Sequence, residues 1–578
     1  MKVQNIRDVR DMRFAKPRMP REQQVLFPER LDELVADDAP VRALATLLED
    51  VDWSAWEKEY VGYGQPPIHP RYMAGAILFG LLHKVRSTRE LERAVRKDID
   101  FIWLLEGFTP DHSSFANFRL RHGEGIKDLH ARIAKTLVMK REKALLHLII
   151  DGTRFRADSD RGGARKADTI SYIIGELEKR MKELEQVGEV TALSETGYIE
   201  GMEPPADEQE ELVFANKEIA TLEKKRAKYQ KALDIAQERD VRNQKHNGKN
   251  AKPVRVPVTD PESQVSPNKE GGFAPNYTPV ATVESQTGAI IHADVLPGSQ
   301  EAEAVLPAVQ AAEELSGEKV DAVLADSNFA SGQVLDALNE GGIDAYMPTR
   351  SASPPDNPAL RSDPSTPVPE EERSRLPKTG KKFSRAAFVY DSENDVYRCP
   401  MGEAMEPYKH GKNKDDVQCA YYRCDACAGC PLAADCINGK ATKRTITRDE
   451  HEELREATDQ RMATSEGKDI YKQRAPGIEG VFGTIKSSMG LRRFSLRGLA
   501  KVRTEWTWIC AAYNLKKLLA LEARIALEAN ICDSFPCVNA SQRYSKRFWC
   551  PEDFSYMKKT KRLNKFPDQS EPYVLAAA

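Results

Sequence analysis

The sequence lacks the features of a membrane or secreted protein. It contains no run of 18 apolar residues, so we expect no membrane-spanning segment. Its first residues, MKVQNIRDVRDMRF, have no apolar core of the kind that a signal peptide requires. Only ten cysteines occur in 578 residues, which does not suggest a disulfide framework. We therefore expect a cytoplasmic protein that has no membrane partner.

The chain also lacks an overall positive charge, which argues against DNA binding by the molecule as a whole. Its formal net charge is −3. The charge is uneven, however: residues 484–517 hold eight Lys or Arg and one acid, Glu505, and residues 541–565 hold eight Lys or Arg and two acids. Local basic surfaces matter more for phosphate contact than the total. These runs are therefore either DNA-binding surfaces or ordinary solvated faces.

The length suggests three or four structural units, and the first is predicted to be helical. Apolar residues recur at helical spacing through residues 25–140, and we expect an all-α domain over residues 1–140. Its last short helix, in PDHSSFANFRLRHG, has Asp111 or Ser113 as its cap. The arrangement is similar to a helix-turn-helix, which would bind DNA, but simple helical packing fits the pattern as well.

A mixed α/β core is predicted for residues 141–160 and 271–350. LLHLIIDGT and VDAVLAD are apolar runs typical of strands buried on both faces. NYTPVATVES and GAIIHADV predict a hairpin, and helices alternate with further strands up to IDAYMPT. This order predicts a mixed sheet flanked by helices.

Between these two parts, residues 161–270 predict a helical insertion. Two long helices are expected at 168–187 and 206–240, because apolar residues alternate in steps of three and four. The residues that define the first helix are Ile170, Ile174, Leu177, Met181 and Leu184. An antiparallel coiled-coil hairpin is expected, which acts as a spacer, a dimerisation element or a DNA clamp.

Composition divides the rest of the chain. Residues 351–385 are rich in Pro and Ser and are predicted to be a flexible linker. A Cys-rich insertion follows at 386–442, then helices over 443–530 and a basic tail over 531–578.

Two aspartates are the first candidates for chemistry. Asp151 and Asp326 each end a predicted buried strand, where an unpaired carboxylate costs desolvation energy. Mg²⁺ would offset this cost, because it binds carboxylates together with water and phosphate. The ends of strands are also where α/β proteins place their sites. The alternative is that each Asp only caps a loop.

A third carboxylate, Glu479, lies in YKQRAPGIEGVFGTIKSSMG. The buried stripe of this predicted helix consists of Ile478, Val481, Phe482 and Ile485. Glu479 and Lys486 are seven residues apart and so share a helix face, with Tyr471 and Arg474 just upstream. An acid beside cationic groups suits a metal ligand near phosphate-binding residues. Ordinary solvated helix charge is the alternative.

Together these motifs resemble those of bacterial insertion-sequence transposases. IIDGT, AVLADSNF and YKQR…IEGVFGTIK occur in the order found in that family, and the last is similar to its Tyr-Arg-Glu-Lys signature. The step from Arg474 to Glu479 is one residue longer than in that signature. HPRYMAGAILFGLL, RSTRELERAVRKDI and PDHSSFANFR are similar to the N-terminal domain of the InsH-type branch. The resemblance covers roughly residues 25–340 and 385–520.

The resemblance implies an RNase H-like fold and an Asp, Asp, Glu triad made of Asp151, Asp326 and Glu479. It implies cleavage of DNA at the ends of a mobile element and then attack of the freed 3′-OH on target DNA. Mg²⁺ or Mn²⁺ would be the cofactor, since two ions about 3.5–4 Å apart can serve both phosphoryl transfers. The residues expected to bind DNA are Tyr471, Arg474, Lys486, Arg492, Arg493 and Arg497.

Double-stranded DNA is the partner that the resemblance implies, as terminal inverted repeats and as target. A homodimer is expected in the DNA complex, and a bacterial protein of this kind is nucleoid-associated when bound. Two other functions stay open: an RNase H-like nuclease without strand transfer, and an inactive DNA-binding protein descended from a transposase.

Cys399, Cys424, Cys427, Cys430 and Cys436 cluster within 38 residues, in YRCPMGEAM…CDACAGCPLAADC, with Cys419 as a sixth cysteine. Two Cys-x-x-Cys steps favour a structural Zn²⁺ site, and free thiols are the alternative. Four ligands are needed, and a similar Cys-containing insertion in the family favours Cys399, Cys427, Cys430 and Cys436. No histidines form a ligand pair at helical spacing.

Overall fold

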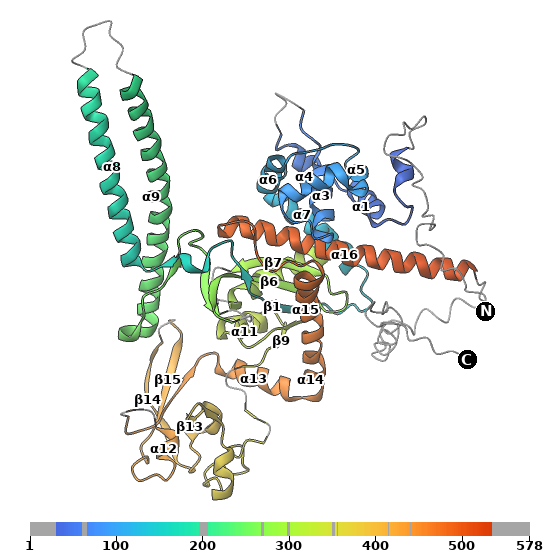
Figure 1. Ribbon diagram of the computed structural model, residues 1–578. Coiled ribbons are helices and arrows are strands. Elements are labelled where there is room, and N and C mark those ends of the chain that lie inside the picture. The colour runs from blue at the N-terminus through green and yellow to red at the C-terminus, as the bar shows by residue number, and fades with distance from the viewer. Residues whose placement is uncertain are drawn as a thin grey trace, which may run out of the picture. The chain divides into compact units, whose positions relative to one another are not determined.

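The computed structural model describes residues 30–534 apart from 61–65, 196–205, 268–270, 297–300, 350–352, 355, 414–415, 438 and 440 (Figure 1). The chain divides into two units, Met1–Leu519 and Ala520–Ala578. Most of the predicted basic tail, from residue 535 onward, lies outside the described residues. Within the described part, no helix is both long and apolar enough to cross a membrane.

Helices fill the N-terminal part of the described chain, as the apolar spacing predicts. They are α1 (Pro40–Glu49), α2 (Ser54–Glu57), α3 (Pro70–Leu82), α4 (Thr88–Lys97), α5 (Ile99–Leu104), α6 (His112–Arg121) and α7 (Gly123–Val138). Ser87 and Glu90 form a capping box at the start of α4. The carboxylate of Asp111 accepts the Ser114 N–H at 2.7 Å, so Asp111 is the cap of α6.

A seven-stranded mixed sheet forms the centre of the first unit. Its strands are β1 (His147–Gly152), β2 (Phe155–Arg156), β5 (Gln264–Pro267), β6 (Phe273–Glu284), β7 (Ile290–Leu296), β8 (Ala322–Leu324) and β9 (Asp344–Tyr346). The order is β2-β6-β1-β8-β9, and β5 and β7 also pair with β6. Strands β1, β8 and β9 are parallel, whereas β6 runs antiparallel to β1 and to β7. The predicted strands and the β6–β7 hairpin are thus confirmed, within a mixed helix and sheet architecture.

Helices hold this sheet in place. They include α10 (Val305–Ser316), α11 (Gly332–Glu340) and α16 (Leu499–Ser534). The indole of Trp506, on α16, donates to the Val280 carbonyl at 3.0 Å. The buried amide of Asn514 bonds both the N–H and the carbonyl of Ile290, at 2.9 and 2.8 Å. These bonds satisfy buried polar groups and fix the start of α16 against β6 and β7.

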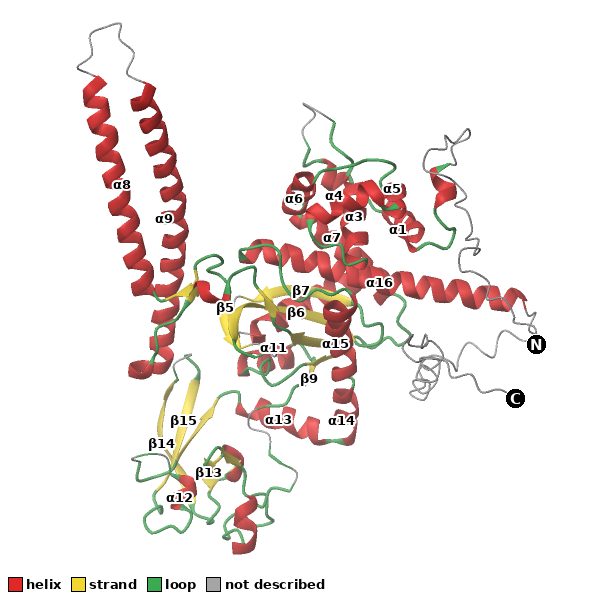
Figure 2. Cartoon of the chain, viewed as in Figure 1, coloured by secondary structure: helices red, strands yellow, loops and turns green. Residues whose placement is uncertain are grey.

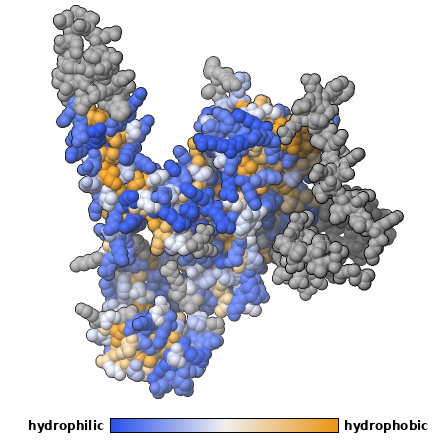
Figure 3. Space-filling view, in the orientation of Figure 1, coloured by the Kyte–Doolittle hydropathy of each residue, from blue (hydrophilic) through white to orange (hydrophobic). Residues whose placement is uncertain are grey.

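The predicted coiled-coil hairpin is present as α8 (Ala167–Glu195) and α9 (Ala206–Asn247), which lie side by side in Figure 2. All five residues that predict the apolar seam of α8 are buried. On α9, Ala232, Leu233 and Ala236 are buried with them. Figure 3 shows apolar residues along the coil amid hydrophilic ones, which is the pattern of a two-helix seam. At its base, β3 (Ala164–Arg165) pairs with β4 (Val256–Pro257).

The Cys-rich region is a small antiparallel sheet. Its strands, in order, are β12 (Val389–Asp391), β13 (Val396–Arg398), β14 (Ala404–Lys412), β15 (Gln418–Cys424) and β16 (Thr445–Asp449). A short helix, α12 (Ala433–Cys436), follows β15. Because residues 445–449 pair with β15, the prediction of helices from residue 443 is wrong for these residues. Helices resume at α13 (Glu452–Ala463), followed by α14 (Ser465–Lys472) and α15 (Arg474–Gly483).

The segment predicted to be a flexible linker, 351–385, is packed in its described part. Ala359, Val368 and Leu376 are buried in the core of the Cys-rich region. The guanidinium of Arg361 donates to the carbonyls of Ala359, Pro364, Thr366 and Cys399. A β-hairpin of β10 (Lys378–Thr379) and β11 (Lys382–Phe383) ends the segment. The prediction was wrong because side chains, which composition does not reveal, satisfy the carbonyls of this Pro-rich backbone.

Candidate active site

The two candidate aspartates lie at one edge of the sheet. Parallel pairing places Ile149 of β1 opposite Leu324 of β8. Asp151 lies two residues further along β1, and Asp326 lies two residues past Leu324, just beyond the end of β8. Neighbouring strands are about 4.8 Å apart, so the two aspartates come from adjacent parallel segments of the sheet.

Asp151 is held by two partners. Its Oδ1 accepts the N–H of Gly152 at 2.9 Å, and its Oδ2 lies 3.2 Å from Nη2 of Arg474. Burial raises the pKa of Asp151, opposed by the charge of Arg474 and by the Gly152 hydrogen bond. The negative charges of Asp326 and Glu479 raise that pKa further.

Glu479 lies on α15, which packs directly on β1. A Cβ on Gly477 would come within 2.4 Å of Ile149 Cδ1, so glycine allows this close approach. The predicted stripe of Ile478, Val481, Phe482 and Ile485 is buried, as expected. Glu479 is exposed on the same helix. The three predicted carboxylates therefore come from β1, the end of β8 and a helix on β1.

Arg474 and Tyr471 lie near Asp151. Arg474 begins α15, and its ion pair with Asp151 is largely shielded, with 17% and 21% of the two side chains exposed. Burial raises the pKa of Tyr471, whose phenol also feels the charges of Arg474, Asp326 and Asp151. Arg474 and Glu479 are one residue further apart in the sequence than in the family signature, yet Arg474 still pairs with Asp151.

Lys486 lies at the end of β1, where the helix that carries it changes form. A π-helical turn, Thr484–Ser488, follows α15, and Gly490 then leaves the helix with a φ of 69°. The Lys486 ammonium donates to the Thr153 hydroxyl and, at 3.3 Å, to the Arg154 carbonyl. It also lies 5.2 Å from the centre of the Phe155 ring. Lys486 is thus partly buried against the segment that follows β1.

The arginines predicted to bind DNA, Arg492, Arg493 and Arg497, are exposed, and each contacts another group of the protein. Arg493 Nη2 lies 2.5 Å from one oxygen of Asp158, and Arg497 Nε lies 2.9 Å from the other. Arg492 donates from Nε to the Lys486 carbonyl at 3.3 Å. Sequence analysis did not anticipate Asp158, because it is more than 330 positions away along the chain. DNA would have to compete with this carboxylate for two of the three arginines.

A fourth carboxylate that sequence analysis missed is also present. A Cβ built on Gly152 would come within 2.9 Å of the Oε1 of Glu301, so that side chain lies over the residue next to Asp151. Burial raises the pKa of Glu301, as do the charges of Asp326 and Asp151, and a hydrogen bond from Asn328 opposes the rise. Glu301 does not end an apolar run, so no sequence pattern marked it.

The four carboxylates have the oxygen chemistry that Mg²⁺ prefers. As the side chains lie, no three His, Cys, Asp or Glu residues in the described ranges are arranged to hold a metal ion. Arg474 instead supplies the positive charge beside Asp151. The oxygen donors of the site are therefore of the kind that a divalent ion takes, but the described side chains do not gather around one point.

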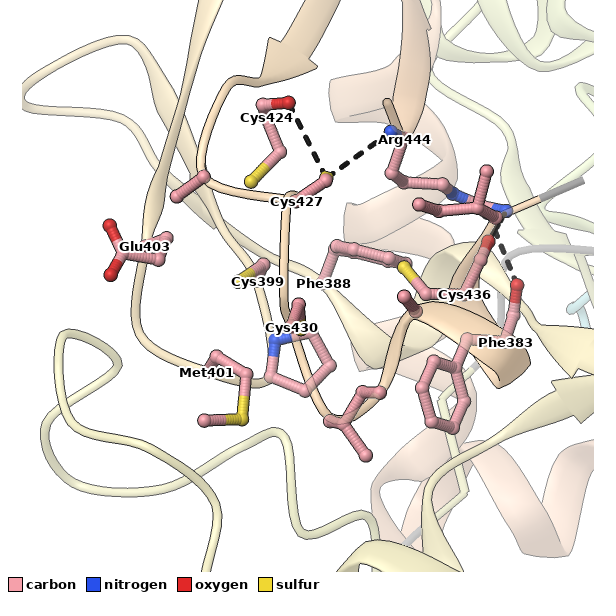
Figure 4. Close-up of a pocket in the computed structure, with 15 residues that line it drawn as sticks. Phe383, Phe388, Cys399, Met401, Glu403, Cys424, Cys427, Cys430, Cys436 and Arg444 are labelled. Atoms are coloured by element: carbon pink, nitrogen blue, oxygen red, sulfur yellow. Dashed lines mark hydrogen bonds between the residues drawn. The ribbon is translucent and has the colours of Figure 1, made fainter. Parts of the chain in front are cut away.

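The candidate zinc ligands line one small cavity in the Cys-rich region (Figure 4). The cavity measures about 30 Å³, enough for one water-sized occupant. Its thiols are Cys399, Cys424, Cys427, Cys430 and Cys436, all of them free. Cys424, which the predicted set leaves out, is therefore among them, whereas Cys419 is not.

These thiols differ in their surroundings. A hydrogen bond from Cys424 and the N–H groups of Met401 and Glu403 lower the pKa of Cys399 to about 6. Burial raises the pKa of Cys436 to about 11. Cys427 Sγ accepts the Arg444 N–H at 3.5 Å, and Cys430 is the least buried of the five. The Cys424 thiol and the backbone N–H groups of Met401 and Glu403 thus favour the thiolate form of Cys399.

Two family models match parts of the chain. A family model for a transposase DDE domain matches residues 398–519, and one for a DUF772 transposase domain matches residues 29–121. The two matches confirm the resemblance to insertion-sequence DDE transposases, and they indicate a transposase. The DDE match includes Glu479 and Lys486, while Asp151 and Asp326 lie outside it. DDE domains generally use a divalent metal ion. No curated protein matches the chain.

Proposed function

We propose that this chain is a DDE transposase that cleaves DNA at the ends of a mobile element and joins the freed 3′-OH to target DNA. The observation that carries the proposal is that Asp151 lies on β1 and Asp326 lies two residues past Leu324 of β8, the parallel neighbour of β1. Glu479, whose charge acts on Asp151, completes the triad.

The residues of the site divide into two groups. Asp151, Asp326 and Glu479 would hold Mg²⁺ or Mn²⁺. When bound, such ions activate the attacking oxygen and stabilise the leaving one. Arg474 offers a planar guanidinium that suits a phosphate, and Lys486 offers a point charge. Thr153 and the Arg154 carbonyl hold Lys486 at the end of β1, so its position relative to the scissile phosphate is fixed in advance.

DNA is the partner of this proposed activity. The N-terminal helices match a transposase domain, which supports a role in recognising element ends. A homodimer would bring two ends together, and the protein would act in the cytoplasm on the nucleoid. Tyr471 is assigned to substrate binding only, since in-line transfer between DNA oxygens needs no protein nucleophile.

A strand-transfer assay tests the proposal directly. Purified protein, Mg²⁺ and a duplex carrying a pre-cut element end are mixed with supercoiled plasmid. Joined products are expected, and they should vanish with Asp326→Asn. Cleavage of uncut ends without any joining would favour the RNase H-like nuclease. Binding with neither reaction would favour the inactive DNA-binding protein.

We also propose that the Cys-rich region binds one structural Zn²⁺. The support is the gathering of five free thiols around one cavity. Closed structural sites take four ligands, all of which can be cysteine sulfurs. Cys399, Cys427 and Cys436 remain proposed ligands, as the sequence predicts. The fourth ligand is either Cys430, as predicted, or Cys424.

A further inference from the structure

The basic stretch of residues 484–517 contains a single acid, Glu505, and that acid is buried. Glu505 lies on the second turn of α16 and is 4% exposed. A buried carboxylate is costly unless hydrogen bonds or opposite charge compensate it. The donors that surround Glu505 therefore indicate what it does.

Ser495 and Leu496 satisfy this carboxylate with four hydrogen bonds. The N–H of Ser495 donates to Oε1 at 2.9 Å and to Oε2 at 3.0 Å, and its hydroxyl donates to Oε1 at 2.7 Å. The N–H of Leu496 donates to Oε2 at 2.9 Å. Hydrogen bonds to an ionised acceptor are about twice as strong as neutral ones, so this carboxylate fixes the backbone of both residues.

Both donors belong to residues 491–498, which we call the arginine segment because it carries Arg492, Arg493 and Arg497. The segment lies between the π-helical turn Thr484–Ser488 and α16 and belongs to neither. Its Phe494 is buried, whereas the three arginines are exposed. The direction in which the arginines point therefore depends on contacts with other elements.

The arginine segment is also held on either side of the Glu505 contact. Before it, the N–H of Phe494 donates to the carbonyl of Arg156 at 2.9 Å. After it, the N–H of Gly498 donates to the carboxylate of Asp260 at 3.1 Å. Glu505 is the anchor between these two, at the residues that separate Arg493 from Arg497.

Arg493 and Arg497 reach one anion, on the same side of the arginine segment. Each pairs with a different oxygen of Asp158, through Nη2 of Arg493 and Nε of Arg497. Arginine binds carboxylates and phosphates in the same way, because both present paired oxygens to the planar guanidinium. The two guanidinium groups are therefore placed so that one DNA phosphate can replace the Asp158 carboxylate.

We propose that Glu505 is a positioning residue for DNA binding, which holds the arginine segment so that Arg493 and Arg497 grip one phosphate together. This inference rests on the proposed function and adds to it a buried residue that acts through others and does not contact DNA. It gives the only acid of the basic stretch a role in the use of its positive charges.

A structural role is the alternative, because Glu505 also compensates buried positive charge. Burial lowers the pKa of Arg119, on α6, and the charge of Glu505 opposes that effect. A purely structural glutamate would affect the stability of the fold. It would leave the contribution of each arginine to DNA binding unchanged in the protein that is folded.

A double-mutant cycle with full-length protein separates the two roles. Affinity for a short end-containing duplex is measured in EDTA, and melting temperature is recorded for each variant. Glu505→Gln keeps the size of the side chain, but its amide nitrogen cannot accept the N–H groups of the segment. This variant should bind about tenfold more weakly, although loss of a negative charge by itself favours DNA binding.

Coupling to the arginines is the decisive readout. Arg493→Ala should weaken binding about fivefold in the wild type and less than about twofold in Glu505→Gln, because the arginine is already misplaced there. Glu522→Gln is the matched control, since it removes the same charge from an exposed position of α16. This control should bind at least as tightly as the wild type.

Ser495→Ala provides a second, milder variant in case Glu505→Gln does not fold. Ser495 is exposed, so the change removes one donor to Glu505 and leaves the core intact. Affinity should fall about threefold at unchanged melting temperature, and Arg493→Ala should again weaken binding less than it does in the wild type.

Equal effects of Arg493→Ala in the wild type and in the folded variants would overturn the positioning role, as would wild-type affinity in those variants. If Arg493→Ala had no effect in the wild type, the arginine segment would not bind DNA and the inference would fall. The triad would still stand or fall by its own cleavage variants. If the wild type neither bound nor cleaved the duplex, the proposed function itself would fail.

Discussion

Nη2 of Arg474 lies 3.2 Å from Oδ2 of Asp151, yet the pKa of that carboxyl is raised, because burial outweighs the ion pair. The ionised form of Asp151 therefore costs the folded state free energy. This cost is absent below the unfolded pKa of 3.8, grows as pH rises through the folded pKa and is complete above it.

Asp151→Asn should therefore raise the melting temperature at pH 7. The gain over wild type should shrink as pH falls toward 4, where the wild-type carboxyl is protonated as well. Melting curves from pH 4 to 8 check this. Mg²⁺ should stabilise the wild type and leave the variant unaffected. A variant less stable than wild type at pH 7 would mean that the Arg474 pair outweighs burial.

Lys486→Ala should weaken binding of a short end-containing duplex and lower the slope of log K against log salt by about one unit. It should also slow cleavage at saturating DNA, because the scissile phosphate is then held less firmly. Lys472→Ala removes an exposed lysine of α14, paired with Asp469, and serves as the control. Equal salt slopes and rates for both variants would show that Lys486 only fastens the helix to β1.

Asp158→Asn should strengthen DNA binding, because it removes the carboxylate that pairs with Arg493 and Arg497. Arg497 keeps its hydrogen bond to the Asp158 carbonyl. An exposed ion pair is worth about 0.2–1 kcal/mol, so a gain in affinity of up to about fivefold is expected. Arg493→Ala in the Asp158→Asn background should cancel much of the gain. If affinity stays the same, these arginines do not face DNA.

Purified protein should contain about one Zn²⁺ per chain, measured by elemental analysis. Cys399→Ser and Cys436→Ser should lose the metal and lower the melting temperature. Cys419→Ser is the control, since Cys419 is buried but outside the cavity. A metal-free, fully folded wild type would leave five free thiols and no zinc site.

Much of this site could be predicted from the sequence, for a physical reason. Asp151 and Asp326 end apolar strands, and strand periodicity is a strong local signal. The buried stripe around Glu479 follows from helical spacing in the same way.

The features that sequence analysis did not predict depend on contacts between segments that are far apart along the chain. Glu301 meets Gly152, and Asp158 meets Arg493, through folding alone. The π-helical turn Thr484–Ser488, which contains Lys486, cannot be recognised from the spacing of apolar residues. The packing of residues 351–385 depends on the bonds of Arg361 to carbonyls, which a Pro-rich composition hides.

Single-turnover cleavage of a labelled element end tests the central claim most directly. Asp151→Asn, Asp326→Asn and Glu479→Gln are compared with wild type in Mg²⁺, with DNA affinity measured in parallel. Each variant should cleave at least about 10³-fold more slowly, about 4 kcal/mol of barrier, while DNA binding largely survives. Near-normal cleavage by any one of the three would remove that residue from the triad and contradict the account.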